Sequence, residues 1–140
     1  MSTIDRTLAE GLIEVSDTLQ RKLHRSYHVS GLTPARLSAL SYIVDQGTAT
    51  GGKLAQAEQV TAPTITRIVD ALEESGHITR TPSTIDRRII ELRPTEKGLT
   101  AAKEGRDWQI QTLSAELSSL GSAQVKTLQA ATEVLRKLDL

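Results

Sequence analysis

The sequence predicts a mainly helical fold with a small β-wing, and three observations lead to this prediction. The chain has 140 residues, enough for one domain, and only 2% of them are aromatic, so aliphatic side chains that suit packed helices must build the core. Apolar residues recur at intervals of three or four along most of the chain. Two strand-like runs, residues 77–81 and 88–93, follow a helical segment that ends near Gly76. This layout is that of a winged helix-turn-helix, which places a helix in the major groove of DNA.

The composition excludes several kinds of protein. The chain has no cysteine, so disulfides, thiolate metal sites and cysteine redox sensing are impossible. Asp5, Arg6 and Glu10 interrupt the N-terminal apolar residues, so a signal-peptide core is absent, and no apolar run is long enough to cross a membrane. We therefore expect a soluble cytoplasmic protein with no membrane association.

The charges balance overall, but they are unevenly distributed. The chain carries 17 basic and 17 acidic residues and has a formal net charge of zero. Arginines gather in the hairpin at Arg80, Arg87, Arg88 and Arg93, against only Asp86 and Glu91. A small basic face on a neutral body predicts weak nonspecific DNA binding that falls quickly with added salt.

The first two helices are predicted from apolar spacing and from residues that begin and end helices. One apolar stripe runs along a long first helix: Ile4, Leu8, Leu12, Val15, Leu19 and Leu23. Thr33 is a good N-cap, and Pro34 fits the first position of a second helix that stops near Gly47. The apolar side of this second helix is formed by Leu37, Leu40, Ile43 and Val44.

The next two helices form the predicted helix-turn-helix. A short helix over residues 53–59 rests on Leu54 and Ala55, with two glycines beside its first turn. Residues 60–63 turn into a second helix, where Pro63 is tolerated in the first turn, and Gly76 closes this helix. Its buried face is Ile65, Ile68, Val69 and Leu72, and its opposite face is Thr64, Thr66, Arg67 and Asp70.

Two more helices follow the hairpin. Thr95 caps a long helix from Glu96 to about residue 118, in which Gly105 is a weak point, and a last helix begins near Ser122. The terminal helices carry more apolar residues than one small winged helix can cover, which predicts a homodimer. An intramolecular bundle around a single core is the alternative.

The order and spacing of these segments resemble the MarR family of bacterial and archaeal transcription regulators. The likeness covers about residues 30–105. It includes Leu32-Thr33-Pro34, Leu54-Ala55, Thr64-Ile65-Thr66-Arg67 and Leu72-Glu73-Glu74-Ser75-Gly76. Its most specific part is Asp86-Arg87-Arg88, followed by Leu92 and Thr95-Glu96-Lys97-Gly98.

The resemblance implies a single domain over residues 1–140. Within it, about residues 33–94 would form the winged helix-turn-helix, and about residues 4–30 and 95–140 the dimerisation helices. The start of the recognition helix would read bases through Thr61, Ala62, Pro63, Thr64 and Thr66. Thr66 is equally well explained as an ordinary surface threonine.

Three arginines and one aspartate complete the implied interface. Arg67 would bind phosphate or guanine, since a guanidinium can bond to either through two nitrogens. Arg88 matches the family's minor-groove arginine, Asp86 the acid that orients it, and Arg87 is placed for phosphate. The alternative for Asp86 and Arg88 is a solvated ion pair of little consequence. Arg80 and Arg93 are expected to be solvated strand residues.

Family members commonly release DNA when a small aromatic or phenolic effector binds. The polar or aromatic groups nearest the expected cleft are Tyr27, His28, Arg36 and Tyr42, although a tyrosine on a helix more often packs against neighbours. His24 and His28 have the spacing of two metal ligands on one helix, but two ligands do not make a site. We therefore expect neither a metal nor a cofactor.

The predicted function is sequence-specific binding to double-stranded DNA. The protein would act as a dimeric, ligand-responsive repressor on a pseudo-palindromic operator. A winged-helix protein-interaction module without specific DNA binding is the alternative, which the neutral net charge permits. An enzyme is not expected, because the sequence lacks a cysteine nucleophile, a phosphate-binding glycine loop, a zinc-protease helix and a serine elbow.

Overall fold

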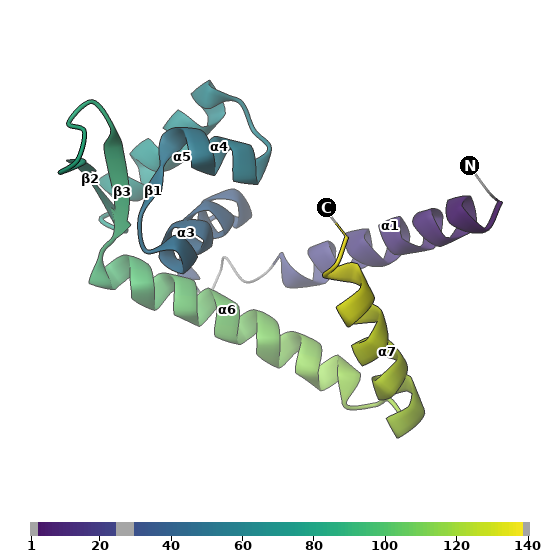
Figure 1. Cartoon of the computed structure of the whole chain (residues 1–140). Coiled ribbons are helices and arrows are strands. Elements are labelled where there is room, and N and C mark those ends of the chain that lie inside the picture. Colours follow the sequence, from purple (N-terminus) through teal and green to yellow (C-terminus); the bar gives the residue numbers. More distant parts are fainter. Residues whose placement is uncertain (1–2, 25–29, 139–140) are drawn as a thin grey trace. The chain divides into compact units, whose positions relative to one another are not determined.

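Helices and one small sheet make up the structure, a computed structural model that describes residues 3–24 and 30–138 (Figure 1). It forms two compact units, residues 1–108 and residues 109–140. The first unit contains α1, α3, α4, α5, the three strands and the first half of α6, and the second contains the rest of α6 and α7. The predicted fold class, a winged helix-turn-helix flanked by long helices, is confirmed.

The first helix, α1 (Thr3–Leu23), spans the predicted apolar stripe from Ile4 to Leu23. Its apolar residues Leu8, Leu12, Ile13, Val15 and Leu19 are 40–61% exposed. The apolar stripe that predicts this helix therefore remains uncovered in the part of the chain that the structure describes.

The centre of the core is α3 (Pro34–Gln46), and its two ends follow the sequence prediction. The Thr33 hydroxyl oxygen accepts a hydrogen bond from the backbone N–H of Arg36 at 3.4 Å. Gly47 ends the helix with φ 73°, a conformation that glycine adopts without steric penalty. The buried residues of α3 are Leu37, Ala39, Leu40 and Ile43.

The short strand β1 (Ala49–Thr50) leads into α4 (Gly51–Glu58), which begins two residues earlier than predicted. The reason is a cap: the Thr50 hydroxyl accepts a hydrogen bond from the N–H of Lys53 at 3.3 Å. Gly51 and Gly52 therefore lie inside the first turn.

The second helix of the helix-turn-helix is α5 (Ala62–Glu74), which carries Pro63 in its first turn, as predicted. Its N-cap is Thr61, which the sequence did not predict. Its C-terminus is closed by Gly76, with φ 79°. There the N–H of His77 donates to the carbonyl of Leu72 at 2.9 Å. Ile65, Val69 and Leu72 are buried, while Ile68 is partly buried against the core.

The sheet has the order β1-β3-β2 and is antiparallel throughout. Strands β2 (Ile78–Pro82) and β3 (Ile90–Pro94) pair from Ile78 opposite Pro94 to Pro82 opposite Ile90. Both begin one or two residues later than predicted. Strand β2 begins later because the N–H of His77 takes part in the C-terminal cap of α5. Strand β3 begins later because residues 84–88 form a turn. A hydrogen bond of 2.8 Å from the N–H of Ser83 to the carbonyl of Ile89 closes this turn. We call residues 78–94 the wing.

The helix α6 (Glu96–Leu117) packs on α3 through small residues, which the sequence did not predict. Thr95 caps it as expected, accepting from the N–H of Gly98 at 3.1 Å. Its buried residues are Gly98, Ala101, Ala102 and Gly105, whereas Leu99, Ile110 and Leu117 are exposed. A Cβ at Gly105 would lie 2.8 Å from a Leu37 methyl carbon, so the prediction of a weak point was wrong: this glycine permits a close helix crossing.

In the second unit, α7 (Ser122–Leu135) follows Gly121, whose N–H donates to the side chain of Gln124 at 3.0 Å. No described residue of α7 is buried, and Leu128 and Val134 are 46% and 61% exposed. Among the described helices, none is both long enough and apolar enough to cross a membrane.

Candidate nucleic-acid interface

The N-terminus of α5 presents a surface of small side chains. Thr61, Ala62, Pro63 and Thr64 are all exposed. The Thr61 hydroxyl accepts from the N–H of Thr64 at 3.4 Å and also lies 3.0 Å from the Thr64 hydroxyl. The cap therefore fixes both threonines. With no bulky side chain on this turn, another molecule can approach the helix closely, and the positive end of the helix dipole favours an anionic one.

Thr66 and Arg67 lie one turn further along and differ in availability. The Thr66 hydroxyl donates to the carbonyl of Ala62 at 2.9 Å, so its proton is already used and its oxygen can only accept. Arg67 is exposed and forms no ion pair with the described residues. Among the described residues, Arg67 is therefore the cation of α5 that no acidic side chain pairs with.

At the turn of the wing, Asp86 holds Arg88. The Arg88 Nε and Nη2 atoms donate to the two Asp86 carboxylate oxygens at 3.1 and 3.2 Å, and the Arg88 N–H donates to Oδ1 at 3.0 Å. These hydrogen bonds lower the pKa of the Asp86 carboxyl. The Arg88 side chain is nevertheless 91% exposed, so the pair presents an oriented guanidinium to solvent. Arg87 beside it is exposed and makes no ion pair with the described part of the chain.

A buried serine that the sequence pattern does not single out organises this turn. Ser83 is 5% exposed, and its hydroxyl accepts from the N–H of Ile85 at 3.2 Å. Ile85 itself is 97% exposed. A serine between two strand-like runs is a turn signal, but its burial depends on the pairing of Ser83 with Ile89 across the hairpin.

The two strand arginines have different environments. Arg93 pairs with Glu91 of the same strand at 2.8 Å and is exposed, as expected. Arg80 instead reaches from β2 to α5, where it pairs with Asp70 at 2.5 Å and Glu73 at 2.9 Å. The expectation that Arg80 is a solvated strand residue was therefore wrong, because sequence spacing cannot reveal that β2 runs beside these two carboxylates.

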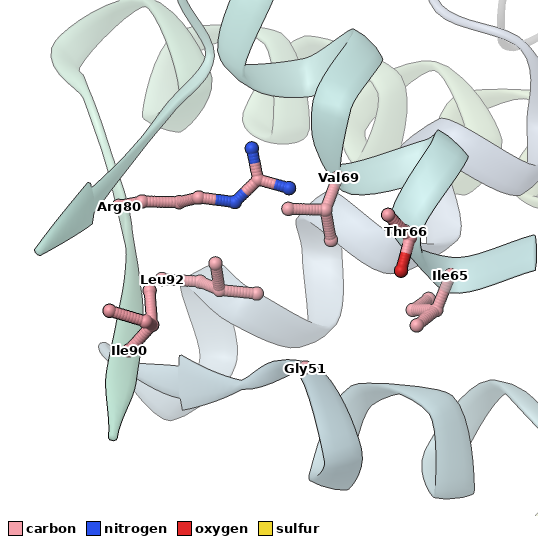
Figure 2. Close-up of a pocket in the computed structure, with 7 residues that line it drawn as sticks. All are labelled: Gly51, Ile65, Thr66, Val69, Arg80, Ile90 and Leu92. Atoms are coloured by element: carbon pink, nitrogen blue, oxygen red, sulfur yellow. The ribbon is translucent and has the colours of Figure 1, made fainter. Parts of the chain in front are cut away.

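A pocket of about 170 Å³ lies between α5 and the wing (Figure 2). Its lining is mostly aliphatic, with one hydroxyl and one guanidinium: Gly51, Ile65, Thr66, Val69, Arg80, Ile90 and Leu92. None of the predicted effector residues lines it. Arg36 and Tyr42 lie on α3, exposed and half-buried respectively, and Tyr27 and His28 fall outside the described residues.

The histidines give no metal site in the described ranges 3–24 and 30–138. There, no group of three or more histidine, cysteine or acidic side chains is placed to share an ion. His28, one of the two histidines with ligand spacing, lies in the stretch that the structure does not describe.

Known proteins resemble this chain in sequence and in fold. The family model described as "MarR family" matches residues 32–90. An uncharacterised HTH-type transcriptional regulator of Mycobacterium bovis, Mb0904, is 29% identical over 96% of this chain and 94% of its own length. The HTH-type transcriptional repressor MdtR of Bacillus subtilis is 32% identical over 57% of this chain and 52% of its own.

Solved structures of MarR proteins have the same fold. A MarR family protein from Bacillus stearothermophilus superposes with a TM-score of 0.85 at 22% identity, covering 98% of this chain and 96% of its own. The apo form of wild-type MarR from E. coli gives 0.81 at 22% identity, covering 91% and 96%.

Proposed function

This chain belongs to the MarR family of HTH-type transcription regulators, whose model matches residues 32–90, and from that premise we propose how it acts. The protein binds double-stranded DNA as a homodimer, represses transcription from a pseudo-palindromic operator, and releases the operator when a small aromatic or phenolic effector binds. It works in the cytoplasm, as a single domain, without a metal, a cofactor or a catalytic reaction.

The observation that carries the proposal is the arrangement of α5 and the wing. In α5 the helix N-terminus at Thr61–Thr64 is exposed and capped, and in the wing the exposed Arg88 guanidinium is held by Asp86. Thr61, Ala62, Pro63, Thr64 and Thr66 face base edges in the major groove, and Arg67 binds a guanine or a phosphate. Arg88 enters the minor groove, while Arg87 contacts a phosphate.

The homodimer is supported by apolar side chains that remain exposed. Leu12 and Leu19 of α1, Ile110 and Leu117 of α6 and Leu128 of α7 are 40–54% exposed. A second copy would cover such faces most economically, because a two-fold contact buries the same patch on both protomers. Two symmetric winged helices then match two half-sites about one helical turn apart.

Repression and ligand response have separate supports. Repression is supported by the relative MdtR of Bacillus subtilis, which is an HTH-type transcriptional repressor. The pocket beside α5 supplies an apolar wall and one guanidinium, and its volume of about 170 Å³ suits a single ring, since a cavity of about 150 Å³ holds benzene. An effector there would contact the recognition helix directly at Thr66 and Val69. The α3 residues Arg36 and Tyr42, together with Tyr27 and His28, are the alternative effector site.

The direct test is enrichment of duplexes from a random-sequence library by the purified protein. The proposal predicts an inverted repeat with half-sites about one helical turn apart, and binding of two protomers per duplex. Enrichment of no sequence would favour the other candidate, a winged-helix protein-interaction module, which the net charge of zero supports.

A further inference from the structure

We infer that Arg80 is a positioning residue that fixes the wing against the recognition helix without itself touching DNA. The inference rests on the proposed DNA binding and adds a residue that acts through two others. Its starting point is the contact between elements: the Arg80 Nη2 atom donates to Asp70 at 2.5 Å and Nη1 donates to Glu73 at 2.9 Å. Each carboxylate has its own nitrogen.

The helical spacing explains why one side chain reaches both acids. Asp70 and Glu73 are three residues apart on α5, so their side chains project from the same face on successive turns. The planar guanidinium offers several N–H groups in a fixed fork and spans the two, whereas a lysine ammonium would act as a single point charge. Both acids contribute to raising the pKa of Arg80, Asp70 most strongly.

We call the contacts of Arg80 with Asp70 and Glu73 the tie, because they join β2 to α5. The position of Arg80 in the strand shows why such a contact is needed there. Along β2, Ile78 is buried at 1% exposure and Arg80, two residues on, points to the same side. No aliphatic side chain follows Ile78 on that side of β2 until Pro82, which is exposed. Figure 2 shows the Arg80 side chain extending from its strand toward Val69 of α5. Beyond Ile78, therefore, polar contacts replace the hydrophobic core between β2 and the helix.

The geometry has a consequence for DNA recognition. The bases and phosphates of one half-site must meet α5 and the turn of the wing together, so the angle between them sets which duplexes fit. The Arg80 contacts join those two elements directly. They also engage two carboxylates that would otherwise be unpaired on the exposed side of the recognition helix.

Two sets of variants test this inference on the full-length protein. Arg80→Gln removes the cation, and the double variant Asp70→Asn with Glu73→Gln removes both anions. Simple electrostatics predicts opposite results, because losing two negative charges beside DNA tightens binding. The tie predicts the same result for both: the ratio of affinity for the enriched duplex to that for random duplex falls about threefold to tenfold, as expected for two partly exposed ion pairs.

The control is Arg93→Gln, which removes an equal charge from the wing but breaks only the pair with Glu91 within β3. We expect that variant to keep its affinity ratio. Arg80→Gln should also keep the wild-type salt dependence of duplex binding, since no phosphate contact is lost. Arg80→Lys, which retains the charge, should recover part of the ratio.

Amide hydrogen exchange of the DNA-free proteins reports the tie independently. Exchange in β2 and β3 should be faster in Arg80→Gln and in the double variant than in the wild type, and unchanged in Arg93→Gln. Wild-type exchange in both variants, tighter and equally selective DNA binding by the double variant, or an equal loss in Arg93→Gln would each overturn the inference. If the wild type enriches no duplex, the proposed function fails and the DNA role of Arg80 fails with it, while exchange still decides whether the tie exists.

Discussion

At the scale of single residues, the arginines near the proposed DNA-binding face differ in what holds them. Arg88 is held by Asp86, yet its side chain is 91% exposed. Arg80 pairs with two carboxylates of α5, whereas Arg67 and Arg87 make no ion pair with the described residues. The sequence alone makes them look alike. Of these four arginines, Arg88 alone combines exposure with a fixed orientation, which is what insertion into a narrow groove requires.

We predict that Arg88→Ala weakens binding to the enriched duplex by about 1–3 kcal/mol, the usual cost of losing a base or groove contact. Fluorescence anisotropy with labelled duplex measures the change. Arg93→Ala is the matched control, since it removes another exposed wing arginine that is paired with a carboxylate. Unchanged affinity in Arg88→Ala would contradict the role given to the wing.

His77 predicts a pH-dependent stability. Its ring is buried at 6% exposure, with Nδ1 2.6 Å from the Ser75 hydroxyl. Burial, followed by the positive charge of Lys97, lowers the pKa of His77. As pH falls through the unfolded value of about 6.5, the unfolded chain takes up a proton that the folded chain refuses, so the free energy of unfolding decreases.

Urea unfolding on either side of pH 6.5 tests this, with His77→Gln as the comparison. The wild type should lose more stability on acidification than the variant, and identical losses would contradict the assignment. Asp86 and Glu91 do not confuse the comparison. Because the pKa values of these two carboxyls are lowered, their contribution to the free energy of unfolding is lost only at a more acidic pH, near and below about 4.

At the scale of elements, the sequence predicts the starts and ends of helices well, because residues close together in the chain determine them. As predicted, Thr33 and Thr95 cap the helices that follow them, and Gly47 and Gly76 end helices with positive φ. The failures concern contacts between distant segments. The sequence predicts a local weakness at Gly105, because in isolation a glycine destabilises a helix. In the structure Gly105 lies against Leu37, which is far away in sequence.

The packing of α6 against the junction between α5 and the wing predicts one glycine that cannot be replaced. A Cβ at Gly98 would lie 2.0 Å from the backbone carbonyl oxygen of His77, which cannot move without displacing the start of the wing. Gly98→Ala should therefore destabilise the protein by about 1–3 kcal/mol or more.

Gly52→Ala is the matched control, because a Cβ there meets no atom within 4 Å and alanine favours the helix. Urea unfolding of both variants gives the comparison. Equal stability of Gly98→Ala and the wild type would contradict the close packing of α6 on the junction between α5 and the wing.

At the scale of the whole molecule, the apolar side chains of α1, α7 and the second half of α6 remain exposed in the single chain. We propose that a second copy of the chain covers them. The spacing of apolar residues predicts a helix, but it does not predict what covers the apolar face of that helix. The spacing is the same whether this face packs on the core of its own chain or on a second copy. The dimer remains our proposal.

We predict that Leu128→Glu shifts the protein from dimer to monomer while keeping its helical content, because Leu128 is 46% exposed in the single chain. Sedimentation over a concentration series measures the shift. Gln129→Glu places the same charge on the neighbouring exposed position of α7 and should remain dimeric. A wild-type protein that is monomeric at micromolar concentration, or a dimer unaffected by Leu128→Glu, would contradict the dimer model.

The central claim is that this chain recognises a particular DNA sequence, and competition binding tests it most directly. Labelled duplex enriched by the protein is titrated in fluorescence anisotropy with excess random duplex, over a series of salt concentrations. The proposed function predicts saturable binding, two protomers per duplex, that survives the competitor. Binding that the competitor abolishes, or that disappears at modest salt for every duplex alike, would show only nonspecific attraction to phosphate and would contradict the claim.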